Sequence, residues 1–444
     1  MQTYLIRTFG CQMNKHDSER VAGLLAAQGL TPVELAEDAD VVVFMTCCVR
    51  ENADERLRGQ VRSLKSVKAG RPGQLIAVGG CIGQRDGETL LRQIPHIDVV
   101  FGTHNIAHLP VLLDAAAAER QPQVEVLSEA DDFTTDLPTQ REHPWHAWVP
   151  ITVGCNNFCS YCVVPYVRGR ERSRTLEDIV SEADNLVSQG VLEVTLLGQN
   201  VNSYGRDIYG EPRFAEALRA VAATGIQRIR FATSHPKDLS ASTIAAMAEV
   251  PAVMPYLHLP VQSGSDTVLA AMNRRYTRAD YLALVARIKA AVPHISISTD
   301  IIVGFPGETE ADFEGTMEVV RTVGYDQAFT FIYSPREGTP AARMEGQVPR
   351  EVSQERFDRL VELVQSSALE NSLPLVGTVQ PVLVEGTSKR DDSMLSGRTA
   401  ANKMVHAPLP EGHSADEYTG RIVNVTIDHA QTWFLSGQLA GTDQ

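Results

Sequence analysis

Apolar strand-like runs alternate with helix-like segments twice along this chain, and no other feature constrains its fold as strongly. The first alternation occupies about 120 residues and has strand-like runs at 3–8, 40–46, 75–79 and 98–101. Helix-like segments follow these runs near 17–28, 52–68, 87–94 and 105–119. Strands that alternate with helices form a parallel sheet covered on both faces, so residues 1–120 are predicted to form a doubly wound α/β domain.

Residues 121–146 interrupt this alternation. They contain three prolines and one arginine against six acidic residues. Such a composition favours a linker, with room for one crossing strand at 123–127.

A second alternation runs over residues 147–370. Its six strand-like runs lie at 148–153, 193–197, 228–232, 256–259, 296–303 and 327–333. Eight strand–helix units would close a barrel, whereas six suit an open, partial (βα)6 barrel. After residue 371 only short alternating strands remain, at 376–384, 393–400, 403–407, 420–428 and 433–439. This last pattern predicts a small β-barrel over 371–444 that resembles oligonucleotide-binding barrels.

Three cysteines lie within eight residues directly after the first strand of the second alternation. Cys155, Cys159 and Cys162 form a C-x3-C-x2-C run. Three thiolates can hold three corners of an iron–sulfur cube and leave the fourth iron open, as catalysis requires. The alternative is a zinc site with His143 or His146 as the fourth ligand, although zinc sites more often use C-x2-C pairs.

Three further cysteines are dispersed in the sequence but follow three successive strands of the first domain. They are Cys11, Cys47 and Cys81. The carboxyl ends of neighbouring parallel strands open into one crevice, so these thiols are expected to face one another and to hold a second cluster. The alternative is that each is a small buried apolar residue. Cys48 is the seventh cysteine and is expected to serve packing.

Composition limits the classes of function. The chain has 444 residues and a net charge of −15, so a nucleic-acid partner must be bound through local basic patches. Its seven cysteines are an odd number, which argues against a disulfide framework. Neither a signal-peptide pattern nor an apolar run long enough to span a bilayer is present, so a cytoplasmic protein without membrane contact is expected.

The cysteine patterns and several other segments together resemble the radical S-adenosylmethionine (SAM) enzymes of the methylthiotransferase family. The C-x3-C-x2-C run, with Tyr161 before its last cysteine, is the signature of the radical SAM superfamily. Within the family, the segments 8–14, 162–170, 197–204 and 232–236 are similar to the branch that acts on isopentenylated adenosine in tRNA. One departure is Met45-Thr46-Cys47, where the family usually has Asn-Thr-Cys.

This resemblance implies a three-part chain: an N-terminal methylthiotransferase domain with an auxiliary cluster, a radical SAM domain, and a C-terminal TRAM domain that binds RNA. The implied cofactors are two [4Fe–4S] clusters and SAM, which serves both as radical source and as methyl donor. The implied reaction is methylthiolation at C2 of N6-isopentenyladenosine beside the tRNA anticodon. The C2–H bond is unactivated, which is why a radical is needed. The electron donor would be a protein such as a flavodoxin or ferredoxin.

Polar residues at later strand ends are the candidates for SAM contacts, although single ones could instead cap helices. These candidates, with the aromatic residue of the signature, are Tyr161, Gln199, Asn200, Ser234, Gln262 and Asp300. Local arginines and lysines are the candidates for RNA contacts, although charge runs are usually solvated faces. They are Arg168, Arg170, Arg172, Arg174, Arg274, Arg275, Lys389 and Arg398.

Two other functions remain open from the sequence. The same chemistry could act on a ribosomal protein or on threonylcarbamoyl-adenosine, or the chain could be a metal-stabilised RNA-binding protein without catalysis. The C-terminal barrel has five basic residues against eight acidic ones, so RNA binding there requires its basic side chains on one face.

Overall fold

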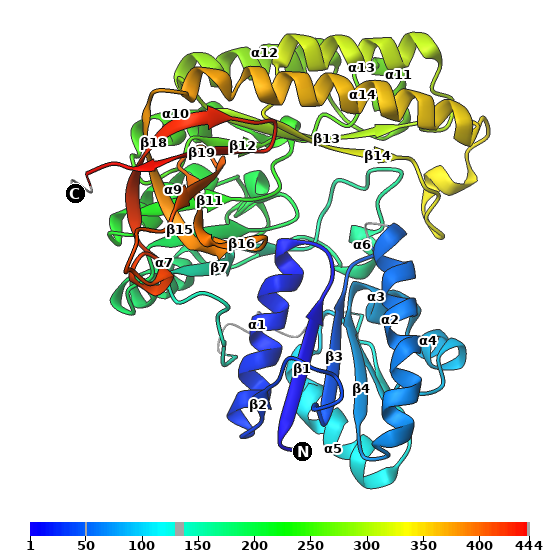
Figure 1. The fold of residues 1–444 in the computed structure, drawn as a ribbon. Coiled ribbons are helices and arrows are strands. Elements are labelled where there is room, and N and C mark those ends of the chain that lie inside the picture. The colour runs from blue at the N-terminus through cyan, green and yellow to red at the C-terminus, as the bar shows by residue number, and fades with distance from the viewer. Residues whose placement is uncertain (49–50, 129–136, 442–444) are drawn as a thin grey trace.

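The computed structural model describes residues 1–48, 51–128 and 137–441 of the chain (Figure 1). An N-terminal α/β unit lies below a barrel of parallel strands, and a small C-terminal β-barrel lies against the side of that barrel. The predicted α/β class, with an open partial barrel and a small closed barrel, is confirmed. No helix among the described residues is both long and apolar enough to cross a membrane.

The N-terminal unit is a six-stranded parallel sheet in the order β2-β1-β3-β4-β5-β6. The strands are β1 (Thr3–Thr8), β2 (Thr31–Pro32), β3 (Val41–Thr46), β4 (Leu75–Gly80), β5 (Val99–Phe101) and β6 (Gln123–Glu125). β3 and β4 are buried along their whole length, as expected for central strands covered on both faces. β6 comes from the segment expected to be a linker and pairs with β5.

Helices cover both faces of this sheet. One apolar core lies under α1 (Gln12–Ala27) and α5 (Leu109–Glu119). The other lies under α2 (Glu51–Gly70), α3 (Cys81–Asp86) and α4 (Glu88–Gln93). Several helix bounds differ from the sequence expectation: for example, α1 begins five residues earlier than residue 17, and α3 begins directly at Cys81, ahead of the helix expected at 87–94.

The second unit contains six parallel strands in chain order. They are β7 (His146–Pro150), β10 (Glu193–Leu197) and β11 (Arg228–Phe231), followed by β12 (Tyr256–His258), β13 (Ser296–Val303) and β14 (Gln327–Ile332). Among the described residues, the backbone pairing that joins the two halves of the barrel is the bridge between Ile229 and Val253. Helices on the outside complete the layer: α7 (Leu176–Ser188), α9 (Phe214–Ala223), α10 (Ala241–Glu249), α12 (Arg278–Ala291), α13 (Glu310–Val323) and α14 (Arg350–Glu370).

The C-terminal unit is a closed barrel in the order β15-β16-β17-β19-β18. Its strands are β15 (Val379–Ser388), β16 (Asp391–Thr399), β17 (Met404–Pro408), β18 (Ile422–Ala430) and β19 (Phe434–Leu439). Buried Arg230 fixes this barrel to the second unit. Its guanidinium donates to the carbonyl oxygens of Thr399 at 2.9 Å and Ala400 at 3.1 Å, and to Glu193 at 2.9 Å. Lys403 also pairs with Asp326 at 2.7 Å, so polar contacts hold the two barrels together.

Candidate active site

The C-x3-C-x2-C run forms a loop at the carboxyl end of the first barrel strands. The strand expected at 148–153 is split into β7 and the short β8 (Thr152–Val153), which pairs with β9 (Arg172–Ser173) below the loop. Gly154 has φ +82°, and a Cβ there would lie 2.1 Å from the carbonyl oxygen of Arg170, so only glycine fits this turn. Ser160 fixes the other end, since its backbone nitrogen donates to the carbonyl of Met272 at 3.1 Å.

In this loop Cys155 and Cys159 are buried and Cys162 is half-buried. Burial raises the pKa of Cys155 to about 11 and that of Cys162 to about 12. Arg274 is the neighbouring cation, with Nη1 3.5 Å from the sulfur of Cys159. Buried thiols become thiolates when a metal binds them. An all-sulfur donor set on one loop fits an iron–sulfur cluster.

The three dispersed cysteines lie at the carboxyl ends of the neighbouring strands β1, β3 and β4 of the N-terminal sheet. Cys11 directly precedes α1, Cys47 follows β3, and Cys81 is the first residue of α3. The side chain of Cys47 hydrogen-bonds to Cys11. A Cβ on Gly10 would lie 2.1 Å from the Cβ of Cys47, so glycine at that position permits this approach.

The dispersed thiols differ electrostatically from those of the loop. The hydrogen bond from Cys47 lowers the pKa of Cys11 to about 6, against the effect of burial. A hydrogen bond from Cys48 is the largest cause that lowers the pKa of Cys81 to about 7, and the charge of Arg168 contributes to the lowered pKa of both Cys11 and Cys81. Cys48 itself is fully buried in the apolar core under α2 and α3, in agreement with a packing role. These contacts favour the thiolate forms of Cys11 and Cys81.

Among the described residues, no three His, Cys, Asp or Glu side chains converge as ligands of one metal ion. A cluster places each thiolate on a different iron, so it does not require such convergence. The two histidines of the zinc alternative have other partners. His146 Nε2 is 3.0 Å from Thr195 Oγ1 inside the barrel, and the His143 ring stacks on Trp145 with centroids 4.9 Å apart.

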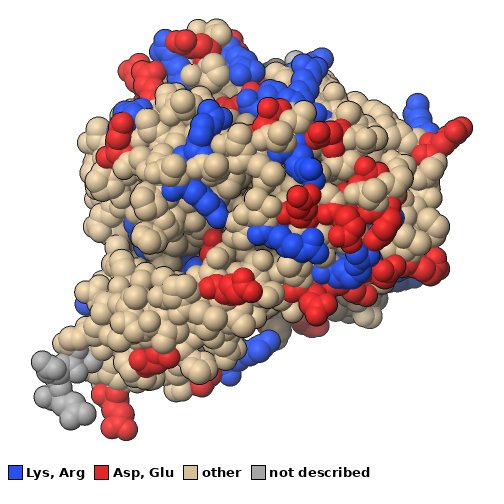
Figure 2. All heavy atoms as spheres, turned by 90° about the horizontal axis from the view of Figure 1, so that it is seen from above, with Lys and Arg blue, Asp and Glu red and all other residues tan. Residues whose placement is uncertain are grey.

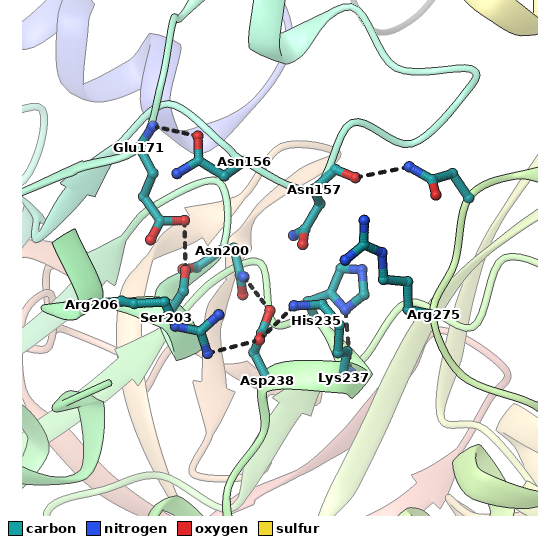
Figure 3. A pocket seen from close by; sticks show the side chains of 11 residues that line it. Asn156, Asn157, Glu171, Asn200, Ser203, Arg206, His235, Lys237, Asp238 and Arg275 are labelled. Carbon is teal, nitrogen blue, oxygen red and sulfur yellow. Dashed lines mark hydrogen bonds and ion pairs between the residues drawn. The ribbon is translucent and has the colours of Figure 1, made fainter. Parts of the chain in front are cut away.

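A polar cavity of about 160 Å³ opens beside the cysteine loop (Figure 3). Asn200 Nδ2 donates to Asp238 at 2.7 Å, and Ser203 donates to Glu171 at 2.7 Å. Arg206 pairs with Asp238 at 3.3 Å. The lining residues are Asn156, Asn157, Glu171, Asn200, Ser203, Arg206, His235, Lys237, Asp238, Asn273 and Arg275.

Several buried polar atoms around this cavity have no hydrogen-bond partner within the described part of the chain. They include Asn200 Oδ1, Asn202 Nδ2 and Ser234 Oγ. An unpaired buried polar atom costs free energy, so such a group indicates a ligand that supplies donors and acceptors. The site thus fits a small polar ligand beside the thiols of the loop.

The expected SAM contacts do not all reach this cavity. Asn200 lines it, whereas Gln199 accepts a hydrogen bond from the backbone of Gly154 at 2.5 Å. The Tyr161 ring lies edge-on to Phe305, with centroids 6.5 Å apart. The two remaining candidates belong to the barrel wall: Gln262 has φ +70° and bridges to Ile301, and Asp300 Oδ2 lies 3.4 Å from His258.

Three of the arginines expected to contact RNA are buried and have protein partners. Arg168 donates to Asp17 at 2.8 Å, Arg174 donates to the carbonyl of Pro150 at 3.1 Å, and Arg274 donates to that of Pro260 at 3.0 Å. They are 5%, 4% and 8% exposed, respectively. This burial corrects the expectation, because the three guanidiniums cannot reach a phosphate in this conformation.

The other expected RNA contacts are more accessible. Arg170, Arg275 and Lys389 are exposed, and Arg172 and Arg398 are half-buried. The Arg170 guanidinium stacks over the Phe158 ring at 4.6 Å. Arg275 lines the cavity, whereas Arg398 pairs with Glu385 at 3.1 Å.

Sequence reasoning missed several polar residues of the cavity. Glu171, Arg206 and Asp238 had no assigned role, yet they form most of its charged wall. Burial raises the pKa of Glu171. Asp238 could have been found by the same criterion as Ser234, because it also follows the strand end of β11.

Three family models match the chain. They are the Radical SAM superfamily over residues 149–320, the Uncharacterized protein family UPF0004 over residues 3–102, and the TRAM domain over residues 375–440.

Curated relatives are similar over nearly the whole chain. A tRNA-2-methylthio-N(6)-dimethylallyladenosine synthase from Streptomyces viridosporus is 51% identical over 435 residues, which cover 97% of this chain and 86% of that relative. The protein of the same name from Moorella thermoacetica is 47% identical over 441 residues, with 99% and 98% coverage. Among solved structures, the radical S-adenosylmethionine methyltransferase TsrM from Kitasatospora setae has a TM-score of 0.54 at 12% identity, over 77% of this chain and 75% of its own, and shows the fold alone.

Proposed function

The chain belongs to the tRNA-2-methylthio-N(6)-dimethylallyladenosine synthase family, and from this premise we propose how its residues divide the work. It is a radical SAM tRNA methylthiotransferase that acts on isopentenylated adenosine in tRNA. The reaction replaces the hydrogen at C2 of the base with a methylthio group. The alternatives of a ribosomal protein, of threonylcarbamoyl-adenosine and of a non-catalytic protein receive no support from these relatives.

Cys155, Cys159 and Cys162 would hold the [4Fe–4S] cluster of the radical SAM domain. When bound, the cluster and SAM supply the radical that can attack an unactivated C–H bond. The buried and unpaired polar atoms of Asn200 and Ser234 would bond the polar groups of SAM. Gln199 would act indirectly on SAM binding, since it accepts the hydrogen bond that holds the turn at Gly154 below the cysteine loop.

Tyr161, Gln262 and Asp300 remain proposed SAM contacts on the barrel side of the loop. Their positions on the wall of the barrel support contact with one end of an extended ligand. The carboxyl ends of barrel strands are where such folds bind ligands.

A second cluster would be held by Cys11, Cys47 and Cys81. The convergence of three strand ends and the thiolate character of two of the thiols support this assignment. Its role would be to present the sulfur that becomes the methylthio group. Reducing equivalents would come from a small redox protein such as a flavodoxin or ferredoxin.

We assign residues 1–120 to the methylthiotransferase domain, 121–146 to the linker, 147–370 to the radical SAM domain and 371–444 to the TRAM domain. Basic and acidic side chains are interspersed on the face over the outer helices (Figure 2), so that face presents no uniform basic field to RNA. Arg170 and Arg275, beside the cavity, are therefore the proposed phosphate contacts near the reacting base. Arg172, Lys389 and Arg398 would add contacts along the path of the tRNA.

One observation carries this proposal: a polar cavity with unpaired buried donors and acceptors around it opens beside the loop that holds Cys155, Cys159 and Cys162. The test is nucleoside mass spectrometry of tRNA from a strain that lacks the gene, with and without the gene restored. We expect 2-methylthio-isopentenyladenosine to disappear in the deletion strain and to return on complementation. If the modified nucleoside persists at normal levels in the deletion strain, the substrate assignment is wrong. Anaerobic reconstitution should give about eight irons per chain and 5′-deoxyadenosine release from SAM under reductant.

A further inference from the structure

Arg168 belongs to the second unit in sequence but lies inside the first unit in space. It directly follows α6 (Val164–Val167), the short helix that begins two residues after Cys162. Val163 and Val167 are part of the apolar core under α2 and α3, together with residues of the N-terminal sheet. Thr103 Oγ1 also donates to the carbonyl of Val167 at 2.8 Å. The segment 163–168 therefore connects the cysteine loop directly to the N-terminal unit.

The guanidinium of Arg168 is 5% exposed and forms a fork with two side chains of α1. Its Nη2 donates to Asn14 Oδ1 at 2.9 Å and to Asp17 Oδ2 at 2.8 Å. Both acceptors are buried, at 0% and 5% exposure. They lie on the first turns of the helix that Cys11 precedes, so the fork fixes the position of that cysteine.

The positive charge of Arg168 also faces the dispersed cysteines. Its side chain hydrogen-bonds to Cys81, and its charge acts on Cys11. Arg85 is another cation near this edge of the sheet, but it is paired with Asp54 and Asp86. Arg168 has one carboxylate partner, Asp17, whereas Arg85 has two, and the Arg168 side chain also hydrogen-bonds to Cys81.

A cluster with three thiolate ligands has a net negative charge, which increases when the cluster is reduced. A buried negative charge needs a compensating positive charge, and the reduction potential of a cluster depends on nearby charge and on hydrogen bonds to its sulfurs. Arg168 is placed to supply the positive charge and a hydrogen bond to a cluster sulfur.

We propose that Arg168 is a positioning residue of the auxiliary site, which sets the reduction potential of the cluster held by Cys11, Cys47 and Cys81 and fixes that site to the SAM-binding loop. This inference rests on the second cluster proposed above. It assigns to Arg168 a role inside the protein instead of the RNA contact expected from the sequence.

The test compares Arg168→Gln and Arg168→Lys with the control Arg92→Gln. The control replaces an arginine of α4 whose side chain is 70% exposed. The full-length protein is reconstituted anaerobically, and the midpoint potential of each cluster is measured by EPR-monitored titration. In Arg168→Gln we expect the auxiliary potential to become more negative while the potential of the other cluster stays unchanged. Arg168→Lys keeps the charge and should keep the potential, but its shorter side chain does not bring the ammonium to the position of Nη2, so both hydrogen bonds to α1 are lost.

Hydrogen exchange of residues 12–18 gives the second measurement. Both Arg168 variants should exchange there about tenfold faster or more, as expected for the loss of a charge-assisted hydrogen bond. Arg92→Gln should match the wild-type protein in both measurements. Should Arg168→Gln fail to fold, Asp17→Asn tests the same proposal. It removes a negative charge instead of a positive one, so the reduction potential of the auxiliary cluster should rise.

An unchanged auxiliary potential in both Arg168→Gln and Asp17→Asn would overturn the proposal. A wild-type protein that binds only about four irons would instead show that the second cluster is wrong, which is a failure of the proposed function. The two failures are thus distinguished by the iron content of the unmodified chain.

Discussion

The docking of the C-terminal barrel depends on one buried arginine, and this dependence gives a quantitative prediction. Arg230 is 8% exposed and makes three hydrogen bonds, two to the turn at Thr399 and Ala400 and one to Glu193. Replacing Arg230 with Gln removes the charge on which all three depend. Glu193, which is 7% exposed, would then keep only Arg228 as a cationic neighbour, at 3.8 Å.

The expected cost follows from this geometry. Breaking a buried ion pair by removing one partner destabilises by about 3–5 kcal/mol, because the remaining charge is left without compensation. Arg228 offsets part of that cost, so the lower end of the range is the better estimate. A loss of about 3 kcal/mol changes the docking equilibrium of the C-terminal barrel by about 10²-fold.

Hydrogen exchange of residues 399–403 measures this docking. In Arg230→Gln we expect exchange there to accelerate by about 10²-fold. The control is Arg219→Gln, which removes an exposed pair with Glu249 whose side chains are 42% and 63% exposed, and it should change nothing there. Adding Glu193→Gln to the Arg230 variant should recover part of the protection, because the unpaired charge is then gone. Equal exchange in Arg230→Gln and in the control would refute the reasoning.

Further predictions concern the cysteines and the turn below them. Cys81→Ala should still cleave SAM but lose sulfur insertion, whereas Cys159→Ala should lose both activities. Measuring 5′-deoxyadenosine and methylthiolated product distinguishes the two variants. Methylthiolated product from Cys81→Ala would contradict the separate roles of the two clusters. Cys47→Ser should lose about half of the bound iron, while Cys48→Ser should keep it, as determined by iron analysis after reconstitution. Gly154→Ala should lower the amount of iron bound at the loop, because the new Cβ would lie 2.1 Å from a backbone oxygen. In addition, φ +82° costs an L-residue about 1–2 kcal/mol before any clash. Full iron occupancy in this variant would show that the turn tolerates a side chain.

The sequence predicted the architecture well where apolar periodicity dominates. β1, β10 and β13 have the expected bounds, since each contains β-branched and other apolar residues and lies close before a glycine, at Gly10, Gly198 and Gly304. The six-strand count led correctly to an open barrel. The family match of the curated relatives confirms the predicted reaction class.

The sequence could not show which polar residues are buried. The first turns of α1 contain Asn14, His16, Asp17 and Glu19, all of which are buried, whereas the sequence predicted a helix only from near residue 17. Arg168 binds Asn14 and Asp17, and the backbone of Glu142 donates to Glu19, so these partners come from distant parts of the chain. The same contact buries Arg168, which belongs to the run of arginines that the sequence suggested as an RNA contact. Charge patterns in a sequence do not distinguish a solvated face from a buried ion pair.

The position of Val163 and Val167 in the N-terminal core has a consequence for dividing this protein. A fragment cut at residue 146 would lack two side chains of its own interior, and a fragment that starts there would expose them to water. The smallest piece that folds as an N-terminal unit is therefore discontinuous, and it must carry residues 163–168 with it. Transplanting the auxiliary site between relatives would require moving both pieces together.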